Sequence, residues 1–142
     1  MRRKLLVILG IFIIILLFIV YLLYNYRNDI IQMQSFNKQY EVYYEKTILG
    51  TDLATVLNKA MDYNKKSDIE KDSKDRYYLE TDKSLFIEIK FSEKDETVRM
   101  EDILSKEVET FISFYGAASF KCTKIEYHES NKQVKSLYFE QV

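Results

Sequence analysis

Residues 5–24 read LLVILGIFIIILLFIVYLLY and contain no charged residue and no proline. Seventeen of these twenty residues are Leu, Ile, Val or Phe. A helix of this length spans about 30 Å, the thickness of the hydrocarbon core of a bilayer. Each large apolar side chain contributes about −0.3 to −0.6 kcal/mol near the membrane centre, so the total is roughly −5 to −10 kcal/mol. The stretch therefore predicts a transmembrane helix.

The flanks of this stretch predict its orientation. Residues 1–4 hold three basic side chains, and positive charge favours the cytoplasmic side of a membrane. The opposite end carries tyrosines, which favour the headgroup region, at positions 21, 24 and 26. We expect a single-pass protein of the cell membrane with a cytoplasmic N-terminus and an extracytoplasmic C-terminal domain. The alternative, a cleaved signal peptide, has a shorter apolar core and small residues before the cut, and neither is found here.

Composition narrows the class of partner. The part after the apolar stretch keeps 18 of the 21 basic residues and all 22 acidic ones, so its net charge is −4. This mild acidity argues against nucleic acid as a partner. The single cysteine, Cys122, cannot form an internal disulfide. It either pairs between chains or lies buried in a strand, and the buried position is the preferred interpretation.

The chain divides into four predicted segments. Residues 1–4 form the basic flank, 5–24 the transmembrane helix, 25–46 an amphipathic membrane-proximal helix, and 47–142 one extracytoplasmic domain. No Pro or Gly interrupts the chain between Gly10 and Gly50, so one continuous helix is expected over the second and third segments. Its weakly apolar stripe either packs against the domain, as we expect, or belongs to a loose stalk. The stripe consists of Ile30, Met33, Asn37, Tyr40 and Tyr44.

Two helices are predicted within the domain. The first follows Gly50, with Thr51 or Asp52 as its N-cap, and ends near Asn64. Its apolar face consists of Leu53, Val56, Leu57, Ala60 and Met61. The second begins at Glu101, where negative charge suits the helix dipole, and runs to residue 115. Gly116 is expected to end it in a left-handed conformation.

The remaining segments predict an antiparallel sheet. Strands are expected at residues 77–79, 84–91 and 97–100, and a C-terminal hairpin at 119–128 and 134–142. The apolar phase changes between Cys122 and Ile125, so a β-bulge is expected near Thr123 and Lys124. Leu137 and Phe139 should point inward, and Asn131 should take the positive φ of the turn. The fold class is therefore predicted to be α+β.

Few residues suggest chemistry. The one histidine, His128, is expected to lie on the surface at a strand end, and no catalytic motif surrounds it. Residues 68–72, DIEKD, resemble the start of a calcium loop, but Ser73 replaces its glycine and Leu79 its terminal glutamate. The polar stretch 64–76 is therefore interpreted as a solvated loop, with ion binding left open. No catalytic, metal-binding or cofactor-binding residue is predicted.

The layout resembles the pilins and pseudopilins of type IV pili and type II secretion systems. Those proteins have a long N-terminal helix, apolar and then amphipathic, that packs against an antiparallel sheet. Residues 5–24, 25–46 and 84–142 correspond to these parts. The family has glutamate at the fifth place after a glycine, whereas Ile15 follows Gly10 at that place, so the processing motif is missing. The composition is also similar to that of small membrane-anchored bacterial proteins encoded by AT-rich genes.

The expected function is binding or assembly in the cell envelope. The chain has twelve Tyr and nine Phe, and tyrosine is favoured at contact surfaces, although it also flanks ordinary strands and membranes. The expected partners are the membrane, envelope proteins or further copies of the chain. Two alternatives stay open: a pilin-like subunit of an envelope filament or secretion system, and a small anchored enzyme or ligand sensor.

Overall fold

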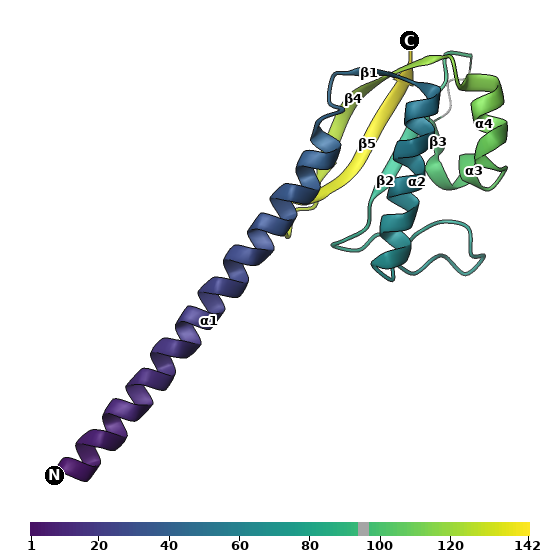
Figure 1. The fold of residues 1–142 in the computed structure, drawn as a ribbon. Helices are drawn as coiled ribbons and strands as arrows, with labels where there is room; N and C mark the ends of the chain where they lie inside the picture. The colour runs from purple at the N-terminus through teal and green to yellow at the C-terminus, as the bar shows by residue number, and fades with distance from the viewer. Residues whose placement is uncertain (94–96) are drawn as a thin grey trace. The chain divides into compact units, whose positions relative to one another are not determined.

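The fold is described here from a computed structural model that covers residues 1–93 and 97–142 (Figure 1). The chain divides into two units, Met1–Ser35 and Phe36–Val142. Helix α1, Arg2–Glu41, supplies all the helical residues of the first unit and continues into the second. The helix thus ends before the predicted residue 46: residues 42, 43 and 45 form turns, and Tyr44 makes an isolated bridge with Cys122.

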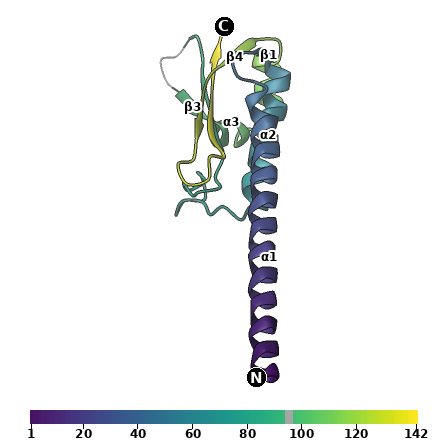
Figure 2. The same ribbon diagram turned by 90° about the vertical axis from the view of Figure 1, so that its left-hand side faces the viewer.

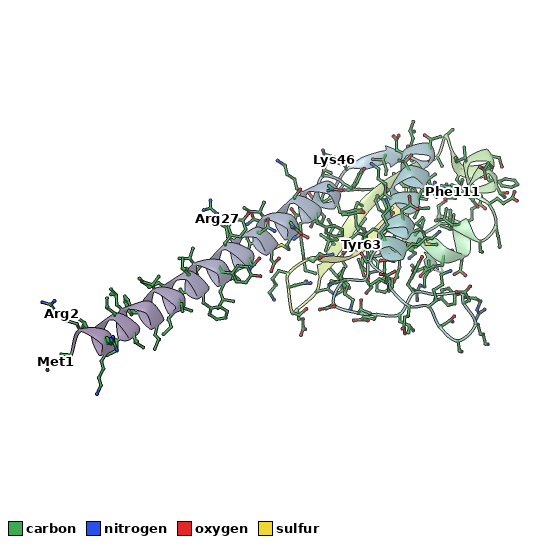
Figure 3. The ribbon with its side chains drawn as sticks, turned by 60° about the horizontal axis from the view of Figure 1, so that its bottom comes forward. Met1, Arg2, Arg27, Lys46, Tyr63 and Phe111 are labelled. Carbon is green, nitrogen blue, oxygen red and sulfur yellow. The ribbon has the colours of Figure 1, made fainter. Side chains whose placement is uncertain are left out.

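The first unit exposes its apolar side chains. No residue of the stretch 5–24 is buried, although nearly all of them are large and apolar. Figure 3 labels Arg2 and Arg27, which lie on either side of this stretch along α1. Within the described residues, α1 is the one helix that is long and apolar enough to cross a membrane. The prediction of a single N-terminal helix with this property is confirmed.

The second unit contains a five-stranded sheet with the order β1-β4-β5-β2-β3. The strands are β1 Thr47–Leu49, β2 Phe86–Lys90, β3 Thr97–Arg99, β4 Ser119–Tyr127 and β5 Val134–Gln141. Neighbouring strands are antiparallel except for β2 and β5, which run parallel from the pair Phe86 and Ser136 onward. The sheet is therefore mostly antiparallel, with one parallel pair that the sequence pattern did not predict.

Three helices cover one face of the sheet, as Figure 2 shows for α2 and α3. They are α2 Gly50–Lys66, α3 Met100–Leu104 and α4 Val108–Tyr115. The apolar face of α2 is buried as predicted, with Leu53 and Leu57 fully covered. On the sheet side the fully covered side chains include Leu85, Ile87, Ile89, Phe120, Leu137 and Phe139. The α+β class is confirmed.

Three predictions about the helices are wrong. The helix expected from Glu101 to residue 115 is two helices, because the chain turns at Glu107, whose φ is 67°. No glycine or proline marks this break in the sequence. Gly116 has φ −56° and is right-handed, and α2 starts at Gly50 after Leu49, without a side-chain cap from Thr51 or Asp52.

Two predictions about the strands are also wrong, and one strand was missed. Residues 77–79 form no strand, since Tyr78 makes only an isolated bridge with Lys71. The positive φ of the hairpin turn falls on Lys132 rather than on Asn131. The short edge strand β1 was not expected.

The bulge and the inward-facing residues of the C-terminal hairpin match the prediction. The register shifts between Cys122 and Lys124, which is the expected bulge, and Leu137 and Phe139 are buried. Cys122 is fully covered within β4, in agreement with the preferred interpretation of a small buried side chain. In the predicted strand 84–91, the alternate residues Leu85, Ile87, Ile89 and Phe91 are buried.

Candidate functional site

A cavity lies in the second unit, at the end of the sheet where β4 turns into β5. It has a volume of about 850 Å³. One wall is the segment 80–82, which leads toward β2, and the other is the end of β4 with the following turn. The residues lining it are Glu80, Thr81, Asp82, Ile125, Glu126, Tyr127, His128, Glu129, Ser130 and Lys135.

Hydrogen bonds hold the two walls in place. Thr81 Oγ1 accepts bonds from the backbone N–H groups of Lys83 and Ser84 at 3.2 and 3.1 Å. In return, Ser84 Oγ accepts a bond from the Thr81 N–H and donates one to its carbonyl. Asn131 Nδ2 donates to the carbonyl of Asp82 at 2.7 Å, which joins this segment to the hairpin turn. The cavity is thus bounded by backbone that side chains fix locally.

His128 lies between the two walls, and the prediction that it is on the surface is wrong. Only 6% of the residue is exposed, because residues around Ser84 cover it. Its Nε2 lies 2.7 Å from the carbonyl oxygen of Ser84. A carbonyl can only accept, so Nε2 carries the proton, and in the neutral ring Nδ1 is left as an acceptor.

The cavity is lined by four carboxylates and one ammonium group. Glu80 binds Lys135, with 2.5 Å between Oε1 and Nζ. Glu126 binds Lys124 at 2.5 Å and accepts a bond from the Tyr138 hydroxyl at 3.1 Å. The hydrogen bond from Lys124 is the largest cause of a lowered pKa at Glu126, which therefore stays ionised at neutral pH.

The two other carboxylates of the cavity are uncompensated. Among the residues the structure describes, neither Asp82 nor Glu129 has a basic side chain within ion-pair distance. Both residues are exposed. The cavity therefore presents an excess of negative charge at its mouth.

Metal-ligating side chains do not cluster in the described part of the chain. Within residues 1–93 and 97–142, no three His, Cys, Asp or Glu side chains converge closely enough to hold a metal ion. The calcium-like segment has another role, since Asp72 Oδ1 accepts backbone bonds from Lys74 and Arg76 at 3.2 and 2.8 Å. The bond from Arg76 is the main reason why the pKa of Asp72 is lowered. Asp72 thus stabilises a turn of its own loop.

A second, smaller cavity of about 250 Å³ continues the first across the outer face of the sheet and shares Glu80, Glu126 and Lys135 with it. In this region, the guanidinium group of Arg99 lies over two aromatic rings. Its guanidinium carbon lies 4.7 Å from the centre of the Tyr77 ring and 5.2 Å from that of Phe86. The outer face thus combines charged and aromatic side chains.

The aromatic residues divide between the core and the surface. Tyr40 and Tyr78 are buried, and Phe36 packs against Tyr63 with ring centres 4.5 Å apart. Other rings are exposed, most of all Phe114 on α4, with 78% of its surface accessible. The many aromatic residues therefore contribute both to core packing and to the exposed surface.

The sequence pattern missed the residues of the main cavity. Asp82 and Glu129 each fall between predicted strands, and nothing in their local sequence suggests that the two segments meet. Comparisons with protein families, with curated proteins and with solved structures find no match to this chain.

Proposed function

We propose that this protein is a single-pass membrane-anchored binding or assembly protein of the cell envelope. In this proposal α1 crosses the membrane through residues 5–24, the basic flank stays in the cytoplasm, and the α+β domain faces outward. The observation that carries it is the exposed apolar run of α1, a helix whose other end is part of a folded domain.

The end of α1 is integrated into the domain core. Asn37 Nδ2 donates to the carbonyl of Lys132, and its Oδ1 accepts from the N–H of Val134, both at 2.8 Å. Tyr40 is 5% exposed, and burial is the main reason why its pKa is raised to about 12. The helix that anchors the chain therefore also supplies core side chains.

The lowered pKa of Glu126 supports ligand binding, rather than catalysis, as the function of the cavity. A general acid needs a carboxyl group whose pKa is raised toward neutrality, whereas the pKa of Glu126 is lowered. In the described part of the chain, every fully buried side-chain nitrogen or oxygen has a hydrogen-bond partner. The carboxylates that line the cavity are suited to recognise a ligand of opposite charge.

The topology is tested by labelling single cysteines in intact cells with a membrane-impermeant maleimide. In a Cys122→Ala background, Lys59→Cys places an exposed thiol on α2, and Arg2→Cys places one on the basic flank. We expect Lys59→Cys to react in intact cells and Arg2→Cys to react only after permeabilisation. The reverse pattern, or a protein that is soluble without detergent, would contradict the proposal.

Binding is tested by photo-crosslinking in cells from a site at the cavity. A photoreactive amino acid at Ser130, which is exposed and lines the cavity, should give a discrete larger species. The matched control places the same group at Asn58, which is exposed on α2. Equal crosslinking from both positions, or none from Ser130, would argue against a binding site here.

A pilin-like subunit is the second candidate function. It is supported by the continuous helix α1, Arg2–Glu41, and by the sheet to which the end of α1 is bonded. This candidate predicts removal of about the first ten residues, as the position of Gly10 implies by analogy with that family. The intact mass of the membrane-extracted protein distinguishes the two, since the anchored binding protein keeps residues 1–10.

A further inference from the structure

We infer that the cavity between the segment 80–82 and the end of β4 binds an organic cation that carries ammonium or guanidinium groups. This inference names a ligand class for the proposed binding function, on which it rests. It does not depend on which side of the membrane the domain faces.

The charge of the cavity is the first argument. Glu80 and Glu126 are already neutralised by lysines, but Asp82 and Glu129 are not. Two uncompensated carboxylates on opposite walls attract positive charge, and the attraction is strongest where a concave surface limits screening by water. An anionic ligand would meet repulsion from both.

His128 supplies the second argument, which is independent of charge. The bond from Nε2 to Ser84 leaves Nδ1 without a hydrogen-bond partner among the described residues. No fully buried side-chain nitrogen there lacks a partner, so Nδ1 must contact solvent, and His128 is one of the residues that line this cavity. A residue that is 94% covered therefore presents an acceptor that a ligand with an N–H or O–H donor can bind.

The spacing of the acceptors does not favour a metal ion held by three of these groups. No three described ligand groups converge, so Nδ1, Asp82 and Glu129 cannot share one small cation. The volume of about 850 Å³ lies in the range of sites that take small organic molecules, about 300–1,000 Å³. An extended molecule with several N–H donors can reach acceptors that are far apart.

The experiment uses the full-length protein in nonionic detergent micelles and isothermal titration calorimetry. The probes are spermidine and the acetylated, amidated tripeptide Arg-Lys-Arg, with the tripeptide Glu-Gln-Glu as the anionic control. The test variant is Asp82→Asn with Glu129→Gln. The matched control is Asp62→Asn with Glu109→Gln, which removes the same charge from exposed positions on α2 and α4.

We expect the cationic probes to bind and the test variant to bind about tenfold more weakly, since each of the two exposed carboxylates adds only modestly to the attraction. The control variant should bind as the unmodified protein does. Binding of both cations indicates their shared chemistry, whereas binding of the tripeptide alone indicates a polypeptide ligand. Binding of spermidine alone indicates a free polyamine.

The single histidine of the chain gives a second readout. Protein labelled with ¹⁵N-histidine, without a histidine tag, shows one imidazole ring, and a bound donor should shift the Nδ1 resonance more than the Nε2 resonance. Three results would overturn the inference: no binding of either cation, an equal loss in the control variant, or a histidine spectrum that the probes leave unchanged. Each of these results can occur even when the protein is membrane-anchored and binds another partner, so it would overturn this inference without overturning the proposed function.

Discussion

Asn64 of α2 binds both backbone groups of Leu85, just before β2. Its Nδ2 donates to the Leu85 carbonyl at 2.7 Å, and its Oδ1 accepts from the Leu85 N–H at 2.9 Å. Both residues are fully buried. The amide side chain therefore imitates the edge of a neighbouring strand and satisfies backbone groups that no strand reaches.

Replacing this amide should be costly. In Asn64→Leu both backbone groups of Leu85 lose their partner, and each buried unsatisfied group costs about 1–3 kcal/mol. We expect the free energy of unfolding to fall by about 2–6 kcal/mol, measured by urea titration with near-ultraviolet circular dichroism of the tyrosines. The control Asn58→Leu, at an exposed position of α2, should change it far less. Equal effects would mean that the bonds to Leu85 contribute nothing specific.

Gly50 is required for close packing between α2 and the end of α4. A Cβ atom at this position would overlap the carbonyl of Tyr115, which is backbone and cannot rotate away. We expect Gly50→Ala to destabilise the domain by about 1–3 kcal/mol, the usual cost of overpacking, as measured by thermal unfolding. Gly10→Ala is the control, because its Cβ would meet no atom within 4 Å. An unchanged melting temperature for Gly50→Ala would show that α4 moves at no cost.

Local sequence patterns predicted the structural features that depend only on residues close together in the sequence. The phase change between Cys122 and Ile125 indicated the bulge, because one extra residue reverses which face a side chain occupies. In the predicted strand 84–91 successive side chains lie on opposite faces, which is why Ile87 and Ile89 both lie inward. The length and apolar character of residues 5–24 likewise needed no knowledge of the rest of the fold.

Features set by distant segments could not be predicted in this way. His128 is buried by residues around Ser84, which lies 44 positions earlier, and its own sequence neighbours are polar and exposed. The break at Glu107 has a positive φ without a glycine, so tertiary packing overrides local preference there. The parallel pairing of β2 with β5 depends on the path of about forty residues between them. The candidate site combines residues 80–82 with residues 125–130, which are far apart in the sequence, and this is why no sequence motif marked it.

Arg99 and Glu101 form an ion pair that also fixes Tyr78. Arg99 Nη2 and Nε lie 2.8 and 3.3 Å from the two carboxylate oxygens, and the N–H of Tyr78 donates to Glu101 Oε1 at 3.1 Å. Glu101 is 5% exposed, so its charge depends on these donors. The sequence had suggested only that this carboxylate favours the start of a helix.

Removing the arginine should leave this carboxylate poorly compensated. We expect Arg99→Met to lower the free energy of unfolding by about 2 kcal/mol, as for a lost hydrogen bond to a charged group. The double variant with Glu101→Gln should lose less than the sum of the two single losses, because the uncompensated charge is gone. Lys59→Met, at an exposed lysine of α2, is the control for loss of a positive charge. Strict additivity in urea titrations would show that the pair is not coupled.

Cys122 should make the stability of the domain depend on pH in the alkaline range. Burial raises the pKa of its thiol from 9.0 to about 11. Below pH 9 the thiol is protonated in both the folded and the unfolded state, so its contribution is complete. As the pH rises from 9 to 11 the unfolded thiol ionises first, and this part of the stability is lost.

Two tyrosines titrate later and can be separated from this effect. The pKa values of Tyr40 and Tyr127 are raised from 10.0 to about 12, mainly by burial, so their contributions are lost above pH 10. Between pH 9 and 10 we therefore expect the free energy of unfolding to fall more steeply for the unmodified protein than for Cys122→Ala. Comparing slopes removes any constant cost of the substitution. Labelling of native Cys122 with a disulfide reagent at pH 8 should also be far slower than after unfolding in urea, because burial suppresses the reactive thiolate. Parallel slopes together with fast native labelling would show that the thiol is accessible in the folded state.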